Sequence, residues 1–490
     1  MIKSEYLSEL FIPYLKKEEK VAQYIQLFRA LQSCILEGKL TAGAKLPATR
    51  PLAHSLKVSR NTVKAAFELL QAEGYIQTRL GAGTFVSDIT SVQLNREQDC
   101  SVQSTLPVEI EFSNLMNRLD WQAHQNITMG LGLLAPALPA MSQFPWIQWQ
   151  RAVNYAGRVM KHESPKSEFG CEELREQIAD YLQIVRGVKC SSSNILIFSG
   201  SQQAIYFTLQ LLINPGESVF VEDPCYFGID GAVNALGAVK VPIAVDESGF
   251  NLQPDDYLKS KLAVVTPSRN YPLGHTMSLT RRMALLNWAN NHNGWVIEDD
   301  YDSEFRFDRP PLTSLQGLSN GQRVIYAGTF SRILHQSIRI GYLVLPDQLV
   351  APFSVAKRLM HGSLPVLPQL ALAKFMANGH FSSHVRKMRK LYSIRRDILR
   401  SLISEQLPSY LQEVSSDGGM HCVYYLKHAL SDIEICDQAA KQGLAIRPLS
   451  SYYSQKMIKQ GLVIGFAGFS ESEQVKAVSI LKHIMVNDIQ

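Results

Sequence analysis

The stretch "NILIFSGSQQAIYFTLQLLI", from Asn194 to Ile213, decides the fold class of the larger part of the chain. A short apolar run is followed by Ser199 and Gly200, and then by a longer run whose length suits a helix. The same order recurs after "SVFVEDP", "LAVVTPS", "GWVIEDD" and "RVIYAGT". Apolar strands that alternate with helices are typical of a mostly parallel, doubly wound sheet. The sequence therefore predicts an α/β domain over residues 112–490, with a smaller α/β lobe from about residue 382.

The first 88 residues have a different pattern, which predicts a compact and mostly helical unit. "ATRPLAHSLKVSRNTVKAAFELLQAEGYI" has the pattern of two short helices around a turn at residues 57–59, with Thr49 and Ser59 as the expected N-caps. "YIQTRLGAGTFVS" then predicts a small hairpin with glycines at its tip. Residues 89–111 are polar and have no sustained period, which is typical of a linker. We therefore predict three parts: residues 1–88, 89–111 and 112–490.

The positive charge of the chain is concentrated in this first unit. The 490 residues carry a net charge of +5, and residues 39–79 hold seven Lys and Arg against two Glu. Helix, turn, helix and hairpin are the parts of a winged helix-turn-helix, whose second helix enters the major groove by its N-terminal end. A solvated helix start would also explain these polar residues, but the hairpin in register favours double-stranded DNA. The predicted DNA contacts are Arg50, Ser59, Arg60, Asn61, Thr62, Lys64, Arg79 and Gly83.

Other properties exclude several classes of protein. The N-terminus lacks the basic start and apolar core of a signal peptide, and no segment has the ~20 apolar residues that span a bilayer. The seven cysteines include no CxxC pair, so neither a disulfide framework nor a zinc site is indicated. Free thiols persist in a reducing compartment. We expect a cytoplasmic protein with no membrane partner and no metal.

Two sets of motifs resemble known families. "ILEGKLTAGAKLPATRPLAHSLKVSRNTVKAAFELLQAEGYIQTRLGAGTFV" resembles the GntR-type winged helix over residues 20–87. "IFSGSQQAIYFTLQLLINPGESVFVEDPCYFG", "VIEDDYDSEFRF" and "YAGTFSRILHQSIRIGYLVLP" resemble fold-type I aminotransferases. The combination resembles the MocR/GabR family of bacterial regulators. This resemblance implies a DNA-binding domain joined to a pyridoxal-phosphate-dependent transferase-like domain, a homodimer, and a small-molecule effector.

The resemblance also implies a cofactor site. "SGSQQA" joins a strand to a helix start, where free N–H groups favour a phosphate. Asp299 can hold a pyridine nitrogen protonated, and Tyr301 can donate to the phenolate oxygen of the ring. The family pattern gives ring stacking to Tyr226 and phosphate contacts to Ser331 and Arg339. A capped strand end, a plain helix start and a core tyrosine are the simpler interpretations. The predicted cofactor site is Gly200, Ser201, Gln202, Tyr226, Asp299, Tyr301, Ser331, Arg332 and Arg339.

One of these positions departs from the family in a way that changes the chemistry. The family motif T-F-S-K carries the lysine that forms the Schiff base, and this chain has "TFSR", with Arg332 in its place. A Schiff base needs a neutral amine, and arginine stays protonated. The turn "ILHQSIR" and the stretch "TPSRN" also depart from the family. Val463 stands where a carboxylate-binding arginine would be, and Arg447 is a candidate replacement.

These observations predict a bacterial transcriptional regulator whose aminotransferase-like domain dimerises, senses a small molecule and has no catalytic residues. Any pyridoxal phosphate would be held without a covalent bond. Two alternatives remain open: an active aminotransferase fused to a DNA-binding module, and a dimerisation scaffold that binds no ligand.

Overall fold

The structure, a computed structural model, describes residues 11, 21–79, 81–88, 113–119, 132–162, 168–307, 312–428, 430–454 and 459–487. The chain divides into two compact units, Met1–Glu109 and Ile110–Gln490. The predicted linker, residues 89–111, lies outside the described residues, so its limits stay predictions. Among the helices that the structure describes, none is both long and apolar enough to cross a membrane.

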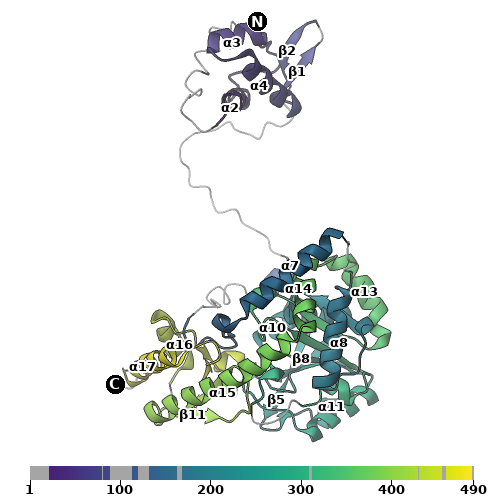
Figure 1. Ribbon diagram of the computed structural model, residues 1–490, viewed down its shortest axis with the longest axis vertical. Coiled ribbons are helices and arrows are strands. Elements are labelled where there is room, and N and C mark those ends of the chain that lie inside the picture. Colours follow the sequence, from purple (N-terminus) through teal and green to yellow (C-terminus); the bar gives the residue numbers. More distant parts are fainter. Residues whose placement is uncertain are drawn as a thin grey trace. The chain divides into compact units, whose positions relative to one another are not determined.

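The first unit consists of helices followed by a two-stranded wing (Figure 1). Its elements are α2 (Gln23–Leu36), α3 (Thr49–Leu56), α4 (Arg60–Ala72), β1 (Ile76–Arg79) and β2 (Gly83–Val86). The two strands are antiparallel, and the pairing runs from Ile76↔Val86 to Arg79↔Gly83. The apolar faces of the helices meet in one core, in which Leu27, Leu31, Leu52, Val63, Ala66 and Leu70 are fully buried.

One of the two predicted helix caps is present. The Ser59 hydroxyl accepts a hydrogen bond from the backbone N–H of Thr62 at 3.0 Å, at the start of α4. The prediction for Thr49 was wrong, because α3 begins at Thr49 and Ala48 is its N-cap. A cap at Thr49 could accept from the backbone N–H of Leu52, at the spacing that Ser59 uses with Thr62. The helix instead starts one residue earlier, because the Leu52 N–H donates to the backbone carbonyl of Ala48 at 3.2 Å.

The second unit is built on an eight-stranded sheet with the order β3-β10-β9-β8-β7-β4-β5-β6. Neighbouring strands from β9 to β5 in this order are parallel, whereas β10 is antiparallel to both β3 and β9, and β6 is antiparallel to β5. The mostly parallel, doubly wound sheet is thus confirmed. Its strands are β3 (Ile195–Phe198), β4 (Ser218–Asp223), β5 (Val239–Asp246), β6 (Gly249–Phe250), β7 (Leu262–Val265), β8 (Trp295–Asp300), β9 (Val324–Thr329) and β10 (Gly341–Val344).

Helices cover both faces of this sheet (Figure 1). Alternate residues of the central strands face opposite sides: Val219 and Val221 pack with α9 (Ser201–Leu212) and α10 (Phe227–Ala235), whereas Phe220 packs with α11 (Leu279–Asn291). Both sides of each strand are therefore apolar, as the sequence pattern required. The other helices of the sheet domain are α7 (Trp146–His162), α8 (Glu172–Arg186), α12 (Leu315–Leu318), α13 (Asp347–His361) and α14 (Val366–Ala377).

A smaller antiparallel sheet forms the predicted C-terminal lobe. Its order is β11-β12-β14-β13, with β11 (Leu411–Val414), β12 (His421–Leu426), β13 (Arg447–Pro448) and β14 (Gly461–Gly465). The long helix α15 (His380–Gln406) packs against α17 (Glu471–Asn487), which also contacts α16 (Asp432–Lys441). The short helix α5 (Asn114–Arg118) contacts α10 of the larger sheet domain.

Candidate functional site

The strands of the large sheet bring four sequence-distant segments to one edge. Because β10 is antiparallel to both β3 and β9, β3 and β9 are parallel to each other, and their carboxyl ends lie at the same edge as those of β4 and β8. Gly200 follows β3, Tyr226 follows β4, Asp299 lies near the end of β8, and Ser331 follows β9. The crevice outside the carboxyl ends of parallel strands is where α/β sheets bind ligands.

A cavity of about 380 Å³ lies at this edge. All nine residues predicted for the cofactor site line it: Gly200, Ser201, Gln202, Tyr226, Asp299, Tyr301, Ser331, Arg332 and Arg339. Five further residues line it that sequence reasoning did not single out, namely Ala137, Tyr271, Thr329, Gln336 and Ser337. Gln336 and Ser337 belong to the turn "ILHQSIR", whose departure from the apolar family pattern was the available signal. The structure thus gathers the predicted residues, and their roles stay predictions.

One end of the cavity has the groups that a phosphate requires. Helix α9 begins directly after Gly200, so the first N–H groups of the helix have no partner within it. Gly200 has a φ of +118°, and a Cβ there would lie 3.5 Å from Nη2 of Arg339. Arg339 therefore lies close to the helix start. The buried Ser331 hydroxyl has no hydrogen-bond partner within the described residues, so it is available to a ligand oxygen.

The floor of the cavity carries a buried acid without a donor. Asp299 is 5% exposed, and its Oδ1 has no hydrogen-bond partner in the part of the chain that the structure describes. Burial, with Asp300 and Glu222 nearby, raises the pKa of Asp299 to about 7, and the charge of Arg332 opposes this rise. A buried acceptor of this kind favours a ligand that brings an N–H group.

Aromatic side chains form the walls. The Tyr271 ring lies edge-on to Tyr226 at 5.6 Å and to Tyr301 at 5.7 Å between centroids. The amide of Gln202 donates to the carbonyl of Gly228 at 2.6 Å, and a Cβ at Gly228 would lie only 2.4 Å from the Tyr226 ring. Flat walls, a buried acid and a phosphate cradle together fit a phosphorylated nitrogen heterocycle such as pyridoxal phosphate.

Arg332 lies inside this cavity rather than outside it. Its Nη1 donates to the carbonyl oxygen of Ala137 at 2.9 Å. Burial raises the pKa of Tyr226, and the nearby charge of Arg332 opposes that rise. Within the described residues, neither Arg332 nor Arg339 has a carboxylate within ion-pair distance. Among the described residues, the cavity therefore has two cations with no carboxylate at ion-pair distance.

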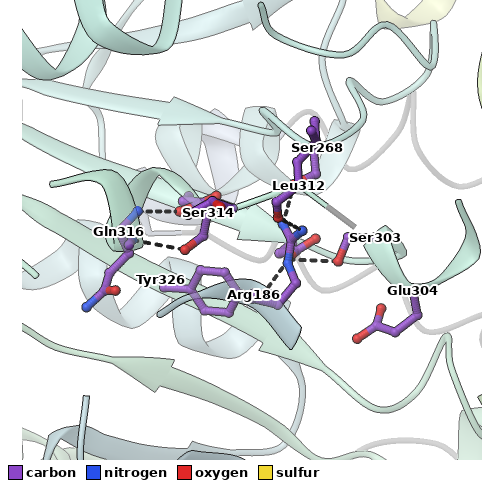
Figure 2. A network of polar contacts seen from close by, with 12 residues as sticks. Arg186, Ser268, Ser303, Glu304, Leu312, Ser314, Gln316 and Tyr326 are labelled. Carbon is purple, nitrogen blue, oxygen red and sulfur yellow. Dashed lines mark hydrogen bonds and ion pairs between the residues drawn. The ribbon is translucent and has the colours of Figure 1, made fainter. Parts of the chain in front are cut away.

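A buried polar network holds the strand that carries Asp299 (Figure 2). Nε of Arg186, on α8, lies 2.8 Å from Oδ2 of Asp300, and these side chains are 1% and 2% exposed. The Ser303 and Tyr326 hydroxyls donate to the same carboxylate oxygen, and Nη2 of Arg186 donates to Ser268. The network holds Asp300 at the end of β8, and the neighbouring residue Asp299 lines the cavity.

The structure also describes Val463 and Arg447, the positions near the C-terminus where the sequence departs from the family pattern. Val463 is fully buried in β14 and packs in a cluster with Tyr271 and Leu449. Arg447 is its direct partner on β13, but it does not line the cavity. Burial raises the pKa of Tyr271, and the charge of Arg447 is among the groups that oppose this rise. Arg447 is therefore near the site, and its replacement of the missing arginine stays a prediction.

Arg269, in "TPSRN", connects the two lobes of the second unit. Its Nε lies 3.3 Å from Oδ2 of Asp302, and its Nη2 donates to the backbone carbonyl of His421 at 3.0 Å. Arg269, which is 7% exposed, thus joins the two lobes through its contacts with Asp302 and His421.

In the first unit, the predicted DNA contacts lie at the start of α3, at the start of α4 and on the wing. Arg50, Ser59, Arg60, Asn61, Lys64 and Arg79 are exposed, and Thr62 and Gly83 are half-buried. Ser59 and Thr62 also share a hydroxyl contact at 2.9 Å. Lys64 lies 3.6 Å from Glu68, an exposed pair that water screens strongly.

Lys45, between α2 and α3, forms a β-bridge with Phe85 of the wing and is a cation that sequence reasoning did not include among the DNA contacts. A Cβ at Gly83, whose φ is +113°, would lie 2.9 Å from Cε of Lys45, so the glycine leaves room for the lysine stem. Lys45 and Arg79 both lie against the Phe85 ring, at 5.8 and 5.0 Å from its centroid. The signal was present, because Lys45 belongs to the same basic run.

Comparisons with known families and regulators agree with both units. Residues 23–86 match the model for bacterial regulatory proteins of the gntR family, and residues 160–481 match that for aminotransferase class I and II. The chain is 33% identical to the probable rhizopine catabolism regulatory protein MocR of Rhizobium meliloti, over 96% of this chain and 94% of MocR. It is 28% identical to the pyridoxine biosynthesis transcriptional regulator PdxR of Corynebacterium glutamicum, over 93% of this chain and 94% of PdxR.

Solved aminotransferase structures resemble the second unit. The kynurenine aminotransferase of Pyrococcus horikoshii superposes with a TM-score of 0.67 at 25% identity, and covers 79% of this chain and 98% of its own. LysN, an α-aminoadipate aminotransferase of Thermus thermophilus, gives a TM-score of 0.69 at 23% identity over 77% of this chain and 98% of its own. The likeness to LysN shows the fold alone.

Proposed function

The chain belongs to the MocR-type transcriptional regulators, in which a gntR-family DNA-binding domain is joined to an aminotransferase class I and II domain, and we propose that its cavity is an effector site that binds pyridoxal phosphate without a covalent bond. In this proposal residues 1–88 bind operator DNA, residues 89–111 link the domains, and residues 112–490 bind the effector and form a homodimer. The name of PdxR connects that relative with pyridoxine biosynthesis, which favours a ligand of this class.

The observation that carries the proposal is the position of Arg332 in the same cavity as Asp299, Tyr226 and Arg339. The helix start, Ser331 and Arg339 would hold the phosphate, Tyr226 would stack on the ring, and Asp299 would accept from its nitrogen. When bound, pyridoxal phosphate supplies a protonated ring that withdraws electrons and an aldehyde that condenses with amines. Arg332 cannot be the amine, and the same fixed charge makes it a poor proton acceptor. Binding without transamination follows from this side chain.

The alternative of a dimerisation scaffold predicts no ligand, but two buried oxygen atoms of the cavity that lack hydrogen-bond partners favour one. Asp299 Oδ1 and the Ser331 hydroxyl are buried and have no partner in the described residues. Leaving each such group without a partner costs roughly 1–3 kcal/mol, which a bound ligand would offset.

Reversion of Arg332 to Lys tests the proposal. The purified full-length protein should bind pyridoxal phosphate with the spectrum of the free aldehyde or its hydrate, lose it on dialysis, and show no transamination of common amino acids. Arg332→Lys should restore covalent attachment, seen as a shifted cofactor band and, after borohydride reduction, as a modified peptide of this loop.

The matched control is Arg332→Met, which removes the charge without providing an amine and should stay unmodified. Covalent attachment within this loop of the unaltered protein would refute the proposal. If neither the unaltered protein nor Arg332→Lys binds the cofactor at saturating concentration, the ligand-free scaffold is the correct interpretation.

A further inference from the structure

The charges that line the cavity carry information about its ligand. Arg339 lies beside the start of α9, and Arg332 lies beside Tyr226, with one hydrogen bond to the Ala137 carbonyl. In the described residues both lack an ion-pair partner. The lining residues include one acid, Asp299, so the charged side chains of the wall are two cations and one carboxylate.

The two cations serve different parts of the cavity. Arg339, together with the helix start and the Ser331 hydroxyl, accounts for one anionic group. Arg332 is not needed there, because its Nη1 donates to the Ala137 carbonyl and its side chain shares the cavity wall with Tyr226. A guanidinium with free N–H donors beside an aromatic wall is well suited to bind a carboxylate in a bidentate manner. A second anionic group on the ligand would use these donors.

None of the described residues that line the cavity is a cation of the small lobe. Val463 is fully buried and apolar, and Arg447 on the neighbouring strand does not line the cavity. The carboxylate of a free amino acid would therefore find its guanidinium at Arg332, on the sheet-domain side, and not in the small lobe. A carboxylate bound at Arg332 would therefore be attached directly to the aromatic ring of the ligand, and not to an amino acid joined to that ring.

We propose that the cavity selects a phosphorylated nitrogen-heteroaromatic acid, whose phosphate binds at Arg339 and the start of α9, whose ring N–H donates to Asp299, and whose carboxylate pairs with Arg332. This inference rests on the proposed effector site and specifies its ligand. The same charge disfavours a ligand with an ammonium group at that position, because like charges in a partly buried site repel.

Calorimetric titration of the full-length protein with four phosphates that differ at one carbon tests this ligand class. The probes are 4-pyridoxic acid 5'-phosphate, pyridoxal 5'-phosphate, 4'-deoxypyridoxine 5'-phosphate and pyridoxamine 5'-phosphate, which carry a carboxylate, an aldehyde, a methyl and an aminomethyl group. The carboxylate should bind about 10- to 100-fold more tightly than the methyl compound, and the amine should bind most weakly. Arg332→Met should bring the carboxylate and methyl compounds within about threefold of each other and leave the methyl compound unaffected. Arg332→Gln is the second variant if Arg332→Met does not fold.

Arg447→Met is the matched control, since it removes a nearby cation that does not line the cavity, and it should keep the preference for the carboxylate. Equal binding of the four compounds by the unaltered protein, or tightest binding of the amine, would overturn the inference and leave the effector site standing. Loss of the preference in Arg447→Met but not in Arg332→Met would also overturn it. Failure of all four compounds to bind would overturn both the inference and the proposed function.

Discussion

Replacing Arg186 by Met should destabilise the second unit by about 3–5 kcal/mol, because it leaves the Asp300 carboxylate charged and buried without its cation. The two side chains are 1% and 2% exposed and lie 2.8 Å apart, so water cannot take the place of the guanidinium. The Ser303 and Tyr326 hydroxyls remain as donors, but they are neutral and cannot balance the charge. Arg186 also donates to Ser268 and Leu312, and these acceptors would lose a partner.

A surface pair provides a matched control for this effect. Arg281 and Asp246 lie 2.9 Å apart, almost the same distance, but their side chains are 25% and 45% exposed. Solvent screens this pair, so Arg281→Met should cost less than about 1 kcal/mol. The comparison separates burial from the ion pair itself, since chemistry and distance are matched.

Guanidinium denaturation, followed by intrinsic tryptophan fluorescence, measures both changes, because all five tryptophans of the chain belong to the second unit. The midpoint should fall clearly for Arg186→Met and hardly at all for Arg281→Met. The double variant Arg186→Met, Asp300→Leu should recover part of the loss, because it removes the uncompensated charge as well as the cation. Equal midpoints for the two single variants would refute the argument that burial makes this network important for stability.

Three further expectations concern DNA and pH. Arg60→Ala should weaken operator binding by ~1–3 kcal/mol and relax sequence specificity. Lys64→Ala should weaken binding to all DNA sequences alike and lower the slope of log binding constant against log salt concentration by about one. Unchanged binding in both variants would show that α4 does not contact DNA. Residues 1–88 alone should fold but bind the operator more weakly than the full chain, as gel-shift titration can show, because two half-sites engaged together gain effective concentration. The folded pKa of Asp299, about 7, lies above its ordinary value, so the contribution of Asp299 to stability is complete at low pH and is lost as pH rises through about 7. The melting temperature of the unaltered protein should therefore fall relative to that of Asp299→Asn between pH 5 and about 8. Parallel pH profiles of the two melting temperatures would contradict this.

Much of the architecture followed from local patterns. The apolar runs that became β3, β4, β7, β8 and β9 could be identified because strands buried on both faces have few polar positions. The winged helix could be identified from the spacing of its helices, the glycines of the wing and the basic run between residues 39 and 79. The Thr49 cap prediction was wrong because the helix begins one residue earlier than the pattern indicated, with the Leu52 N–H donating to the Ala48 carbonyl. The limits of the linker, and the roles of the site residues, stay predictions.

The sequence by itself determined which chemical groups are present: Arg332 replaces an amine that could react, Asp299 stands at the end of an apolar run, and glycine precedes a helix start. Only the tertiary structure decided which of them meet. Tyr271 and Ala137 line the cavity, and Arg447 does not. Arg269 contacts the small lobe through the backbone carbonyl of His421. Arg186 and Asp300, 114 residues apart, form a buried pair that no local pattern indicates. The physical reason is that backbone preferences and periodicity act over a few residues, whereas ion pairing and burial depend on strand order and on the packing of distant segments.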